Sequence, residues 1–275
     1  MFTQDDPLKG VTLQTTAQFT KAAPWRLDLL HDCPDYLLIW ITKGQGLAVL
    51  HGMRHGIGAH TALLIPKHTL FSVDLGRTGA GLVLTLTDAV AMQMRFPEDT
   101  HILRLRDVHI QKELTGHLDR IQFETQQQAP FAEDAIHAHG ALLSVFLRRI
   151  LHSLPETARP SGAQRLVRAF CALVSQEYAR GYPMAEYARM LGVTPTHLTR
   201  SCKECCGVTA ADILTARSLY AARERIETTS QSFKSIGEDL GFGSPAYFSR
   251  FIQNHTGHAP SALRKSARNR LTSAR

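Results

Sequence analysis

The sequence predicts an α+β protein: an antiparallel β-barrel with helices in the N-terminal part and an all-α C-terminal part. Three observations support this prediction. Short apolar runs separated by turns fill the chain to about Asp107, helical periodicity begins near Ile110, and two stretches about fifty residues apart share one layout. We place the domain boundary after residue 158, which gives domains of 1–158 and 159–275.

The β-rich part begins with an aromatic and β-branched run at residues 36–41, which a glycine-containing turn closes. Further short runs follow at residues 47–50, 56–58, 62–65 and 82–86, and His51-Gly52 predicts a tight turn between the first two. Short strands with such turns are typical of an antiparallel barrel or sandwich.

The region from Ile110 to Leu154 has helical periodicity. Apolar residues of its second half share one helix face: Leu143, Phe146, Leu147, Ile150 and Leu154. Such a stripe can cover the β-domain or pair with a second copy, and the two roles are compatible. The proline- and glycine-containing segment 155–162 then predicts a linker.

The net charge of +7 is unevenly distributed along the chain. From Pro160 onward there are 16 Lys and Arg against 8 Asp and Glu, whereas the preceding residues contain 15 against 16. A basic domain attracts phosphate backbones through counterion release, so double-stranded DNA is a candidate partner. A basic surface that is merely solvated would have the same composition.

Several protein classes receive no support from the sequence. No apolar run of about eighteen residues predicts a membrane span, and Met1–Asp6 lacks the basic-then-apolar order of a secretory signal. The five cysteines are an odd number without disulfide-framework spacing, so we expect a cytoplasmic location. No phosphate loop, serine-hydrolase elbow or zinc-protease motif occurs, so neither enzymatic activity nor a cofactor is predicted.

Residues 184–200 and 233–250 repeat one pattern. In each, a small residue (Ala188 or Gly237) precedes a glycine by four positions, which predicts a short helix followed by a sharp turn. A Thr-Pro or Ser-Pro pair then predicts the start of a second helix. Each stretch therefore has the organisation of a helix-turn-helix unit, whose second helix enters the major groove of DNA.

The second stretch and its continuation, from Ile236-Gly237 through Leu240-Gly241-Phe242-Gly243-Ser244-Pro245-Ala246-Tyr247-Phe248-Ser249-Arg250-Phe251 to Gly257-His258-Ala259-Pro260-Ser261, resemble the signature of the AraC/XylS family of transcription regulators. The resemblance covers about residues 165–268. It implies two helix-turn-helix units joined by a long helix, here Thr209 to about Glu227. The N-terminal part is more loosely similar to the cupin-like sensor barrels of that family. The resemblance thus implies a small-molecule effector and a homodimer, with RNA polymerase as a further candidate partner. Activation is the commoner outcome in the family, and repression fits the residues equally.

We expect the second helix of each unit to contact DNA through one polar face. The candidates in the first unit are Thr194, Thr196, His197, Thr199, Arg200 and Lys203. Those in the second unit are Ser244, Ala246, Tyr247, Ser249, Arg250 and Gln253. The two arginines can bind a guanine edge or a phosphate, and any one of these residues alone could be a solvated surface residue.

Cysteine and histidine clusters raise the question of metal or redox chemistry. Cys202 stands where the family pattern has a core phenylalanine, and core packing with Cys205 or Cys206 is the favoured interpretation over a redox switch or a metal site. His51, His55 and His60 lack a suitably spaced carboxylate, so no metal is predicted in the barrel.

An effector would be expected inside the barrel, where aromatic rings provide apolar walls and arginine or histidine orients the ligand. The candidate residues are Trp25, Arg26, Tyr36, Trp40, His51 and His68. Two alternatives remain open. One is an effector-independent regulator whose barrel only dimerises, and the other is a metal-dependent cupin enzyme fused to a DNA-binding domain.

Overall fold

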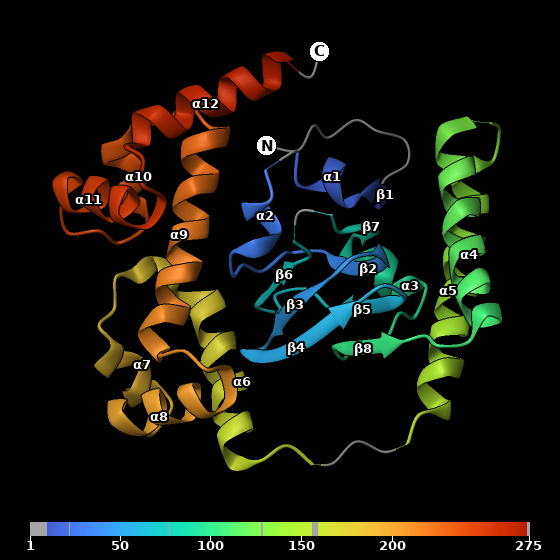
Figure 1. Ribbon diagram of the computed structural model, residues 1–275, viewed down its shortest axis with the longest axis horizontal. Helices are drawn as coiled ribbons and strands as arrows, with labels where there is room; N and C mark the ends of the chain where they lie inside the picture. The colour runs from blue at the N-terminus through green and yellow to red at the C-terminus, as the bar shows by residue number, and fades with distance from the viewer. Residues whose placement is uncertain (1–9, 22, 77, 128, 156–158, 274–275) are drawn as a thin grey trace.

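The computed structural model describes residues 10–21, 23–76, 78–127, 129–155 and 159–273, with side chains up to residue 270 (Figure 1). The expected domain boundary adjoins residues 156–158, which lie outside the described residues, as does the segment Met1–Asp6. Within the described residues, no helix is long and apolar enough to cross a membrane.

The N-terminal domain contains two antiparallel sheets, with strand orders β1-β7-β2-β5-β8 and β4-β3-β6. Their strands are β1 (Val11–Thr15), β2 (Tyr36–Lys43), β3 (Gln45–Leu50), β4 (Met53–Gly58), β5 (Thr61–Ile65), β6 (Phe71–Asp74), β7 (Ala80–Leu86) and β8 (His101–Arg104). The strands expected at residues 36–41, 47–50, 56–58, 62–65 and 82–86 are all present. The expected turn between β3 and β4 is formed by His51 and Gly52, both with positive φ.

Strand β2 is buried on both faces, which explains its unbroken apolar run. Leu37, Ile39 and Ile41 pack in the core between the two sheets. The alternating residues, among them Leu38 and Trp40, belong to a second core on the opposite face of the five-stranded sheet. The space between the sheets is therefore filled with apolar side chains.

Helices complete the N-terminal domain: α1 (Thr16–Phe19), α2 (Trp25–Asp28), α3 (Asp88–Gln93), α4 (Val108–Gln127) and α5 (Ala132–Ser153). The long helices α4 and α5 stand together beside the sheet (Figure 1). Leu143, Phe146 and Leu147 of the predicted stripe are buried in the core shared with the sheet. The buried residues of this stripe thus pack on the β-domain of the same chain, so they are not available to pair with a second copy.

The C-terminal domain is entirely helical within the described residues. Its elements are α6 (Gly162–Glu177), η1 (Tyr178–Arg180), α7 (Met184–Met190), α8 (Pro195–Cys206), α9 (Ala210–Thr228), α10 (Phe233–Asp239), α11 (Pro245–Thr256) and α12 (Pro260–Ser273). Helix α9 matches the expected long helix and begins with a capping box between Thr209 and Asp212. Helices α6, α7 and α8 pack around one hydrophobic core, and α9, α10 and α11 pack around a second.

Candidate nucleic-acid interface

Helices α8 and α11 begin in the same way. The hydroxyl groups of Thr194 and Ser244 accept hydrogen bonds from the backbone N–H groups of His197 and Tyr247, each at 3.2 Å. Proline occupies the first position of both helices, where a missing N–H group costs nothing. Thr194 and Ser244, both expected to contact DNA, thus have a defined role as helix N-caps.

The turn that precedes each of these helices is also shared. Gly192 and Gly241 adopt the left-handed conformation, with φ of 68° and 74°. The residue after each glycine donates a backbone hydrogen bond to the small residue of the preceding helix, Val193 to Ala188 at 3.0 Å and Phe242 to Gly237 at 2.9 Å. Both features are those that the sequence pattern predicts for a helix-turn-helix unit.

Gly237 is explained by the close packing of α10 on α11. A Cβ atom at this position would lie 3.2 Å from the Cβ of Phe248, a distance tighter than most such contacts. In the first unit the equivalent Ala188 is accommodated and fully buried. The second unit therefore brings its two helices close together around a larger core residue.

The outer faces of α8 and α11 present matching rows of polar side chains. Leu198 and Phe248 are buried at equivalent positions, whereas Thr199 and Ser249 are half-buried. The remaining candidates are exposed: Thr194, Thr196, His197, Arg200, Lys203, Ser244, Ala246, Tyr247, Arg250 and Gln253. The structure thus places the predicted residues of each unit on one accessible surface.

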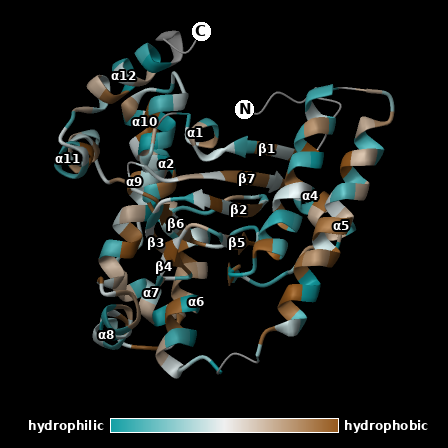
Figure 2. Cartoon of the chain, turned by 45° about the vertical axis from the view of Figure 1, so that its right-hand side comes forward, coloured by the Kyte–Doolittle hydropathy of each residue, from teal (hydrophilic) through white to brown (hydrophobic). Residues whose placement is uncertain are grey.

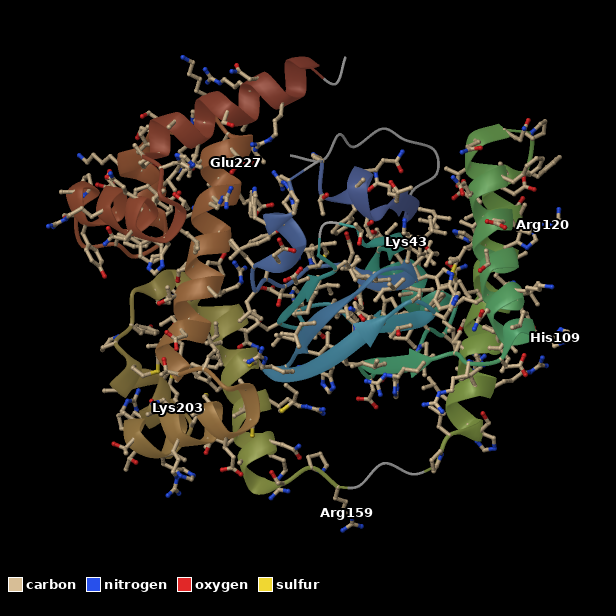
Figure 3. The ribbon with its side chains drawn as sticks, viewed as in Figure 1. Lys43, His109, Arg120, Arg159, Lys203 and Glu227 are labelled. Atoms are coloured by element: carbon tan, nitrogen blue, oxygen red, sulfur yellow. The ribbon has the colours of Figure 1, made fainter. Side chains whose placement is uncertain are left out.

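Helix α11 lies at the edge of the molecule away from the β-sheets, whereas α8 lies closer to them and contacts β4 (Figure 1). A hollow of about 500 Å³ runs along α8 and is lined by Thr196, Thr199, Arg200 and Lys203, of which Lys203 is labelled in Figure 3. Among the described residues, no carboxylate forms a salt bridge with Arg200 or Arg250. These two guanidinium groups are available to an external anion or to a guanine edge.

The cysteines of α8 lie in the core of the first unit. Cys202 and Cys206 are buried together with Cys171 of α6, whereas Cys205 is partly exposed. Cys206 rather than Cys205 fills the space beside Cys202, and burial raises the pKa of the Cys171 thiol. Within the described part of the chain, no group of three or more His, Cys, Asp or Glu residues is arranged to hold a metal ion.

Within the described residues, the six residues expected to form an effector site lie at separate places. Tyr36 and Trp40 point to the helix-covered face of the sheet, because alternate residues of β2 face opposite sides. Trp25 and Arg26 lie on α2, where the Trp25 ring is 5.5 Å from that of Tyr220 on α9.

The two histidines of that set lie at separate turns. His51 Nε2 is 2.8 Å from Thr100 Oγ1, and His68 Nδ1 is 3.8 Å from a carboxylate oxygen of Asp32. Sequence reasoning missed Asp32 and its partner Arg217 of α9, which join the two domains through a 2.7 Å ion pair. The two residues are 185 positions apart, and no local pattern links them.

Comparison with known proteins identifies the C-terminal part. A family profile described as a helix-turn-helix domain matches residues 187–266. The arabinose operon regulatory proteins of Escherichia coli (strain K12) and Salmonella typhimurium are each 26% identical over 124 residues, which cover 45% of this chain. The matched region spans 42% and 44% of their lengths, less than half of each relative.

Solved structures resemble the chain more distantly. Unsaturated fatty acid-bound ToxT from Vibrio cholerae is 17% identical, with a TM-score of 0.41 over 93% of this chain and 95% of ToxT. An AraC-type regulator from Chromobacterium violaceum is 25% identical, with a TM-score of 0.35 over 39% of this chain and 96% of its own. Because these TM-scores are low, the assignment rests on the sequence matches and on the paired units described above. On that basis residues 187–266 form a helix-turn-helix domain, and the chain is similar over part of its length to the arabinose operon regulatory proteins.

Proposed function

We propose that this protein is a sequence-specific DNA-binding transcription regulator that reads DNA with α8 and α11. One observation carries the proposal. Two helices with the same caps, the same turn and the same exposed polar face occur in one basic domain, and each presents an arginine without a carboxylate partner. A single helical hairpin could show this pattern by chance, but a pair provides two equivalent surfaces for successive major-groove segments.

The position of each candidate residue along its helix indicates which part of the DNA it would contact. Residues of the first turn, such as Thr196 and Ala246, are near the helix N-terminus, which enters the groove first in helix-turn-helix proteins. Arg200 and Arg250 lie one turn further along, where a long side chain can reach guanine O6 and N7 or a phosphate. Base contacts would select the sequence, whereas phosphate contacts would fix the register.

The test compares genomic-fragment binding by the wild type and by the Arg200→Ala plus Arg250→Ala variant across a salt series. A matched control, Lys43→Ala plus Arg106→Ala, removes the same charge from exposed positions of the β-domain outside α4 and α5. We expect discrete fragments to be selected by the wild type and the control only. Binding without sequence selection in all three proteins would contradict the proposal, and the salt dependence would report the number of phosphate contacts.

We further propose that the N-terminal domain controls this binding in response to a small-molecule effector. The first unit packs directly on the β-domain: Leu70 is buried in its core, and Met53 and Leu30 pack against that core. A Cβ atom at Gly52 would lie 2.7 Å from Cγ1 of Val167 on α6, so the β3–β4 turn fits closely against the helical domain.

A second contact joins the β-domain to α9, the helix that connects the two units. The Arg217 guanidinium pairs with Asp32 and lies 3.7 Å from the ring centroid of Tyr178. The His31 ring stacks on Tyr220 with centroids 4.2 Å apart and an interplanar angle of 4°. A ligand that changed the position of residues 25–32 would therefore act on the spacing of the DNA-reading helices. Such control is a population shift between docked and undocked arrangements.

We also propose that the protein acts as a homodimer through the outer surface of α4 and α5. The inner stripe is occupied, but Phe123 and Leu142 are 52% and 55% exposed on these helices, and Phe131 between them is 81% exposed. Large exposed apolar patches commonly mark protein–protein interfaces, and we propose that these three side chains contribute to one. Sedimentation of the wild type and of Phe123→Glu plus Leu142→Glu tests this proposal. A wild-type monomer at micromolar concentration would contradict it.

Two other roles remain distinguishable by experiment. An effector-independent regulator would show no ligand-induced rise in melting temperature, because only a ligand of the native state raises it. A metal-dependent enzyme would retain a stoichiometric metal after purification. We expect neither behaviour from this protein.

A further inference from the structure

A pocket of about 440 Å³ lies between the five-stranded sheet and α4, on the side of that sheet away from the intersheet core. Trp40 and Thr42 at the end of β2, together with His60, form one wall. The other wall is the N-terminal half of α4, which stands beside the sheet (Figures 1 and 2). This volume lies within the range of small-molecule sites.

Both walls are fixed by hydrogen bonds. The backbone N–H of His60 donates to Ile41 O at 2.8 Å, and His60 O accepts from Leu105 N–H at 2.9 Å. On the opposite wall, Gln111 Nε2 donates to Leu105 O at 2.8 Å and so ties α4 to the segment after β8. The pocket is therefore preorganised, which lowers the entropy cost of binding a ligand.

The hydroxyl groups of the two pocket threonines are already engaged. Thr42 Oγ1 donates to Ala80 O at 3.2 Å, and Thr115 Oγ1 donates to Gln111 O at 2.9 Å. By contrast, Lys112 and Asp119 have no hydrogen-bonding or ionic partner among the described residues. The pocket thus offers an external ligand one positive and one negative group, with few free neutral polar groups.

The two charges share one face of α4. They are seven positions apart, or two turns, so both side chains project toward the same side of the helix at axial positions about 10 Å apart. Gly116 lies between them, and a Cβ atom there would meet no atom within 4 Å. A glycine within a helix costs about 1 kcal/mol relative to alanine, and here it leaves open space in the pocket wall.

We propose that this pocket binds a small zwitterion with an aromatic body, such as an aromatic amino acid. Its ammonium group would pair with Asp119, and its carboxylate, about 3 Å away on the same carbon, would pair with Lys112, whose long side chain can reach along the helix toward Asp119. Its ring would lie over Gly116 and against the exposed ring of His60, which is 5.9 Å from the buried ring of Trp40. An anion alone would be repelled by Asp119 and a cation alone by Lys112, so the pair of charges selects a ligand that carries both.

This inference rests on the proposed effector control and gives it a site and a ligand class. The pocket is built from β2 and α4, so a ligand would bridge the sheet and the helix pair that we propose as the dimer surface. Binding would thereby stabilise one position of α4 against the sheet.

The test uses three probes that share a phenyl ring: L-phenylalanine, 3-phenylpropionate and 2-phenylethylamine. Calorimetry on the full chain measures their affinities, and tryptophan fluorescence reports contact near Trp40. Gly116→Leu fills the pocket, whereas Gln126→Leu, which puts the same side chain on the exposed C-terminal end of α4, is the matched control. Leucine is a good helix former, so neither replacement should unfold α4. Lys112→Ala and Asp119→Ala each remove one charge.

We expect L-phenylalanine to bind with a dissociation constant of about 1 mM or below, and the other two probes about tenfold more weakly. Gly116→Leu and each charge variant should weaken L-phenylalanine binding about tenfold, whereas Gln126→Leu should leave the affinity unchanged. Absence of binding at about 10 mM would overturn the proposal. So would equal binding to the Gly116→Leu variant or equal affinity for the three probes.

Measuring DNA binding by the same proteins without any probe distinguishes a failure of the proposed ligand site from a failure of the proposed function. If the wild type selects DNA fragments but binds no probe, only the ligand site is wrong. If it selects no fragments, the proposed function fails whatever the probes do.

Discussion

The two helix-turn-helix units have the same local construction but different surroundings. Their turns, caps and buried core positions correspond residue by residue. The core of the first unit contains the buried Leu70 of the β-domain, whereas the second core meets that domain through the partly buried Leu29. Local sequence thus specifies each proposed DNA-reading helix, and its surroundings determine what can control it.

The second unit is held by α12 and α9. Arg264 of α12 donates to Ile226 O at 3.0 Å and to Gln231 O at 2.7 Å. Arg270 of α12 pairs at 2.6 Å with Glu227 near the end of α9, a residue labelled in Figure 3. These contacts fasten α12 to the second unit, so changes in the β-domain should reach that unit mainly through α9.

The largest expected effect is on DNA binding, and it tests whether the two units contribute equally. Arg200→Ala and Arg250→Ala should each weaken specific binding by about 1–3 kcal/mol, roughly ten- to a hundredfold, at different positions of the site. Their combination should approach the sum if the units act independently. Titration of one selected fragment with the single and double variants measures this. Loss confined to one variant would show that only one unit reads DNA.

The next effect concerns pH and the contact between the β-domain and α9. Burial, together with the nearby Arg217 and Arg26, lowers the pKa of His31 to about 4. Because the folded pKa is below the ordinary value of 6.5, this stabilisation is complete above pH 6.5 and is lost as the pH falls toward 4. The loss should reach at most about 3 kcal/mol.

His31→Phe keeps the ring stacking but does not titrate, so its unfolding free energy should vary less over this pH range. Asp28 acts in the opposite sense, because burial and the nearby Asp74 raise its pKa to about 6. Denaturant unfolding between pH 4 and pH 7 of the wild type and the variant provides the comparison. Identical pH profiles would exclude His31 as the source.

A smaller effect should mark the attachment of α12 to the second unit. Glu227 is 2% exposed at its side chain and lies between Arg223 and Arg270. Glu227→Gln should destabilise the protein by about 2 kcal/mol, less than for a fully buried pair because Arg270 is partly exposed. Thermal unfolding and proteolysis of α12 would detect the change. Unaltered stability would show that this ion pair contributes little.

The smallest expected effects are changes in unfolding free energy at Ala188 and Gly237, where the two helices of each unit cross. Ala188→Gly in the first unit should cost about 1 kcal/mol through helix propensity alone. The reverse change, Gly237→Ala, gains that propensity but forces the new methyl group against Phe248, so a net change below about 1 kcal/mol is expected. Unfolding free energies of both variants test the difference. A large gain from Gly237→Ala would show that Phe248 moves away easily.

Much of the fold could be predicted from the sequence because it depends on local signals. Proline and hydroxyl caps defined α8 and α11, and the alternating or continuous apolar runs located most of the strands. Strands β1, β6 and β8 were missed. They are short and offer weaker patterns, and each is defined mainly by its pairing with a partner strand.

The two candidate sites also differ in how far local sequence predicts them. The polar faces of α8 and α11 follow from helical periodicity, so their residues could be named from the sequence. The residues of the proposed effector site could not be named from the sequence, because the direction of Trp40 depends on which face of the sheet the helices cover. The Asp32–Arg217 ion pair was also unpredictable, because it joins segments that are distant in the sequence. Gly116 gave no sequence signal, since its role depends on the sheet that α4 faces.

The central claim, that α8 and α11 read two segments of one DNA site, is tested most directly by footprinting a selected fragment with the wild type, Arg200→Ala and Arg250→Ala. The account predicts two protected major-groove segments about one helical turn apart, with each variant losing protection at a different segment. Protection of a single segment, or a footprint that neither variant alters, would contradict it.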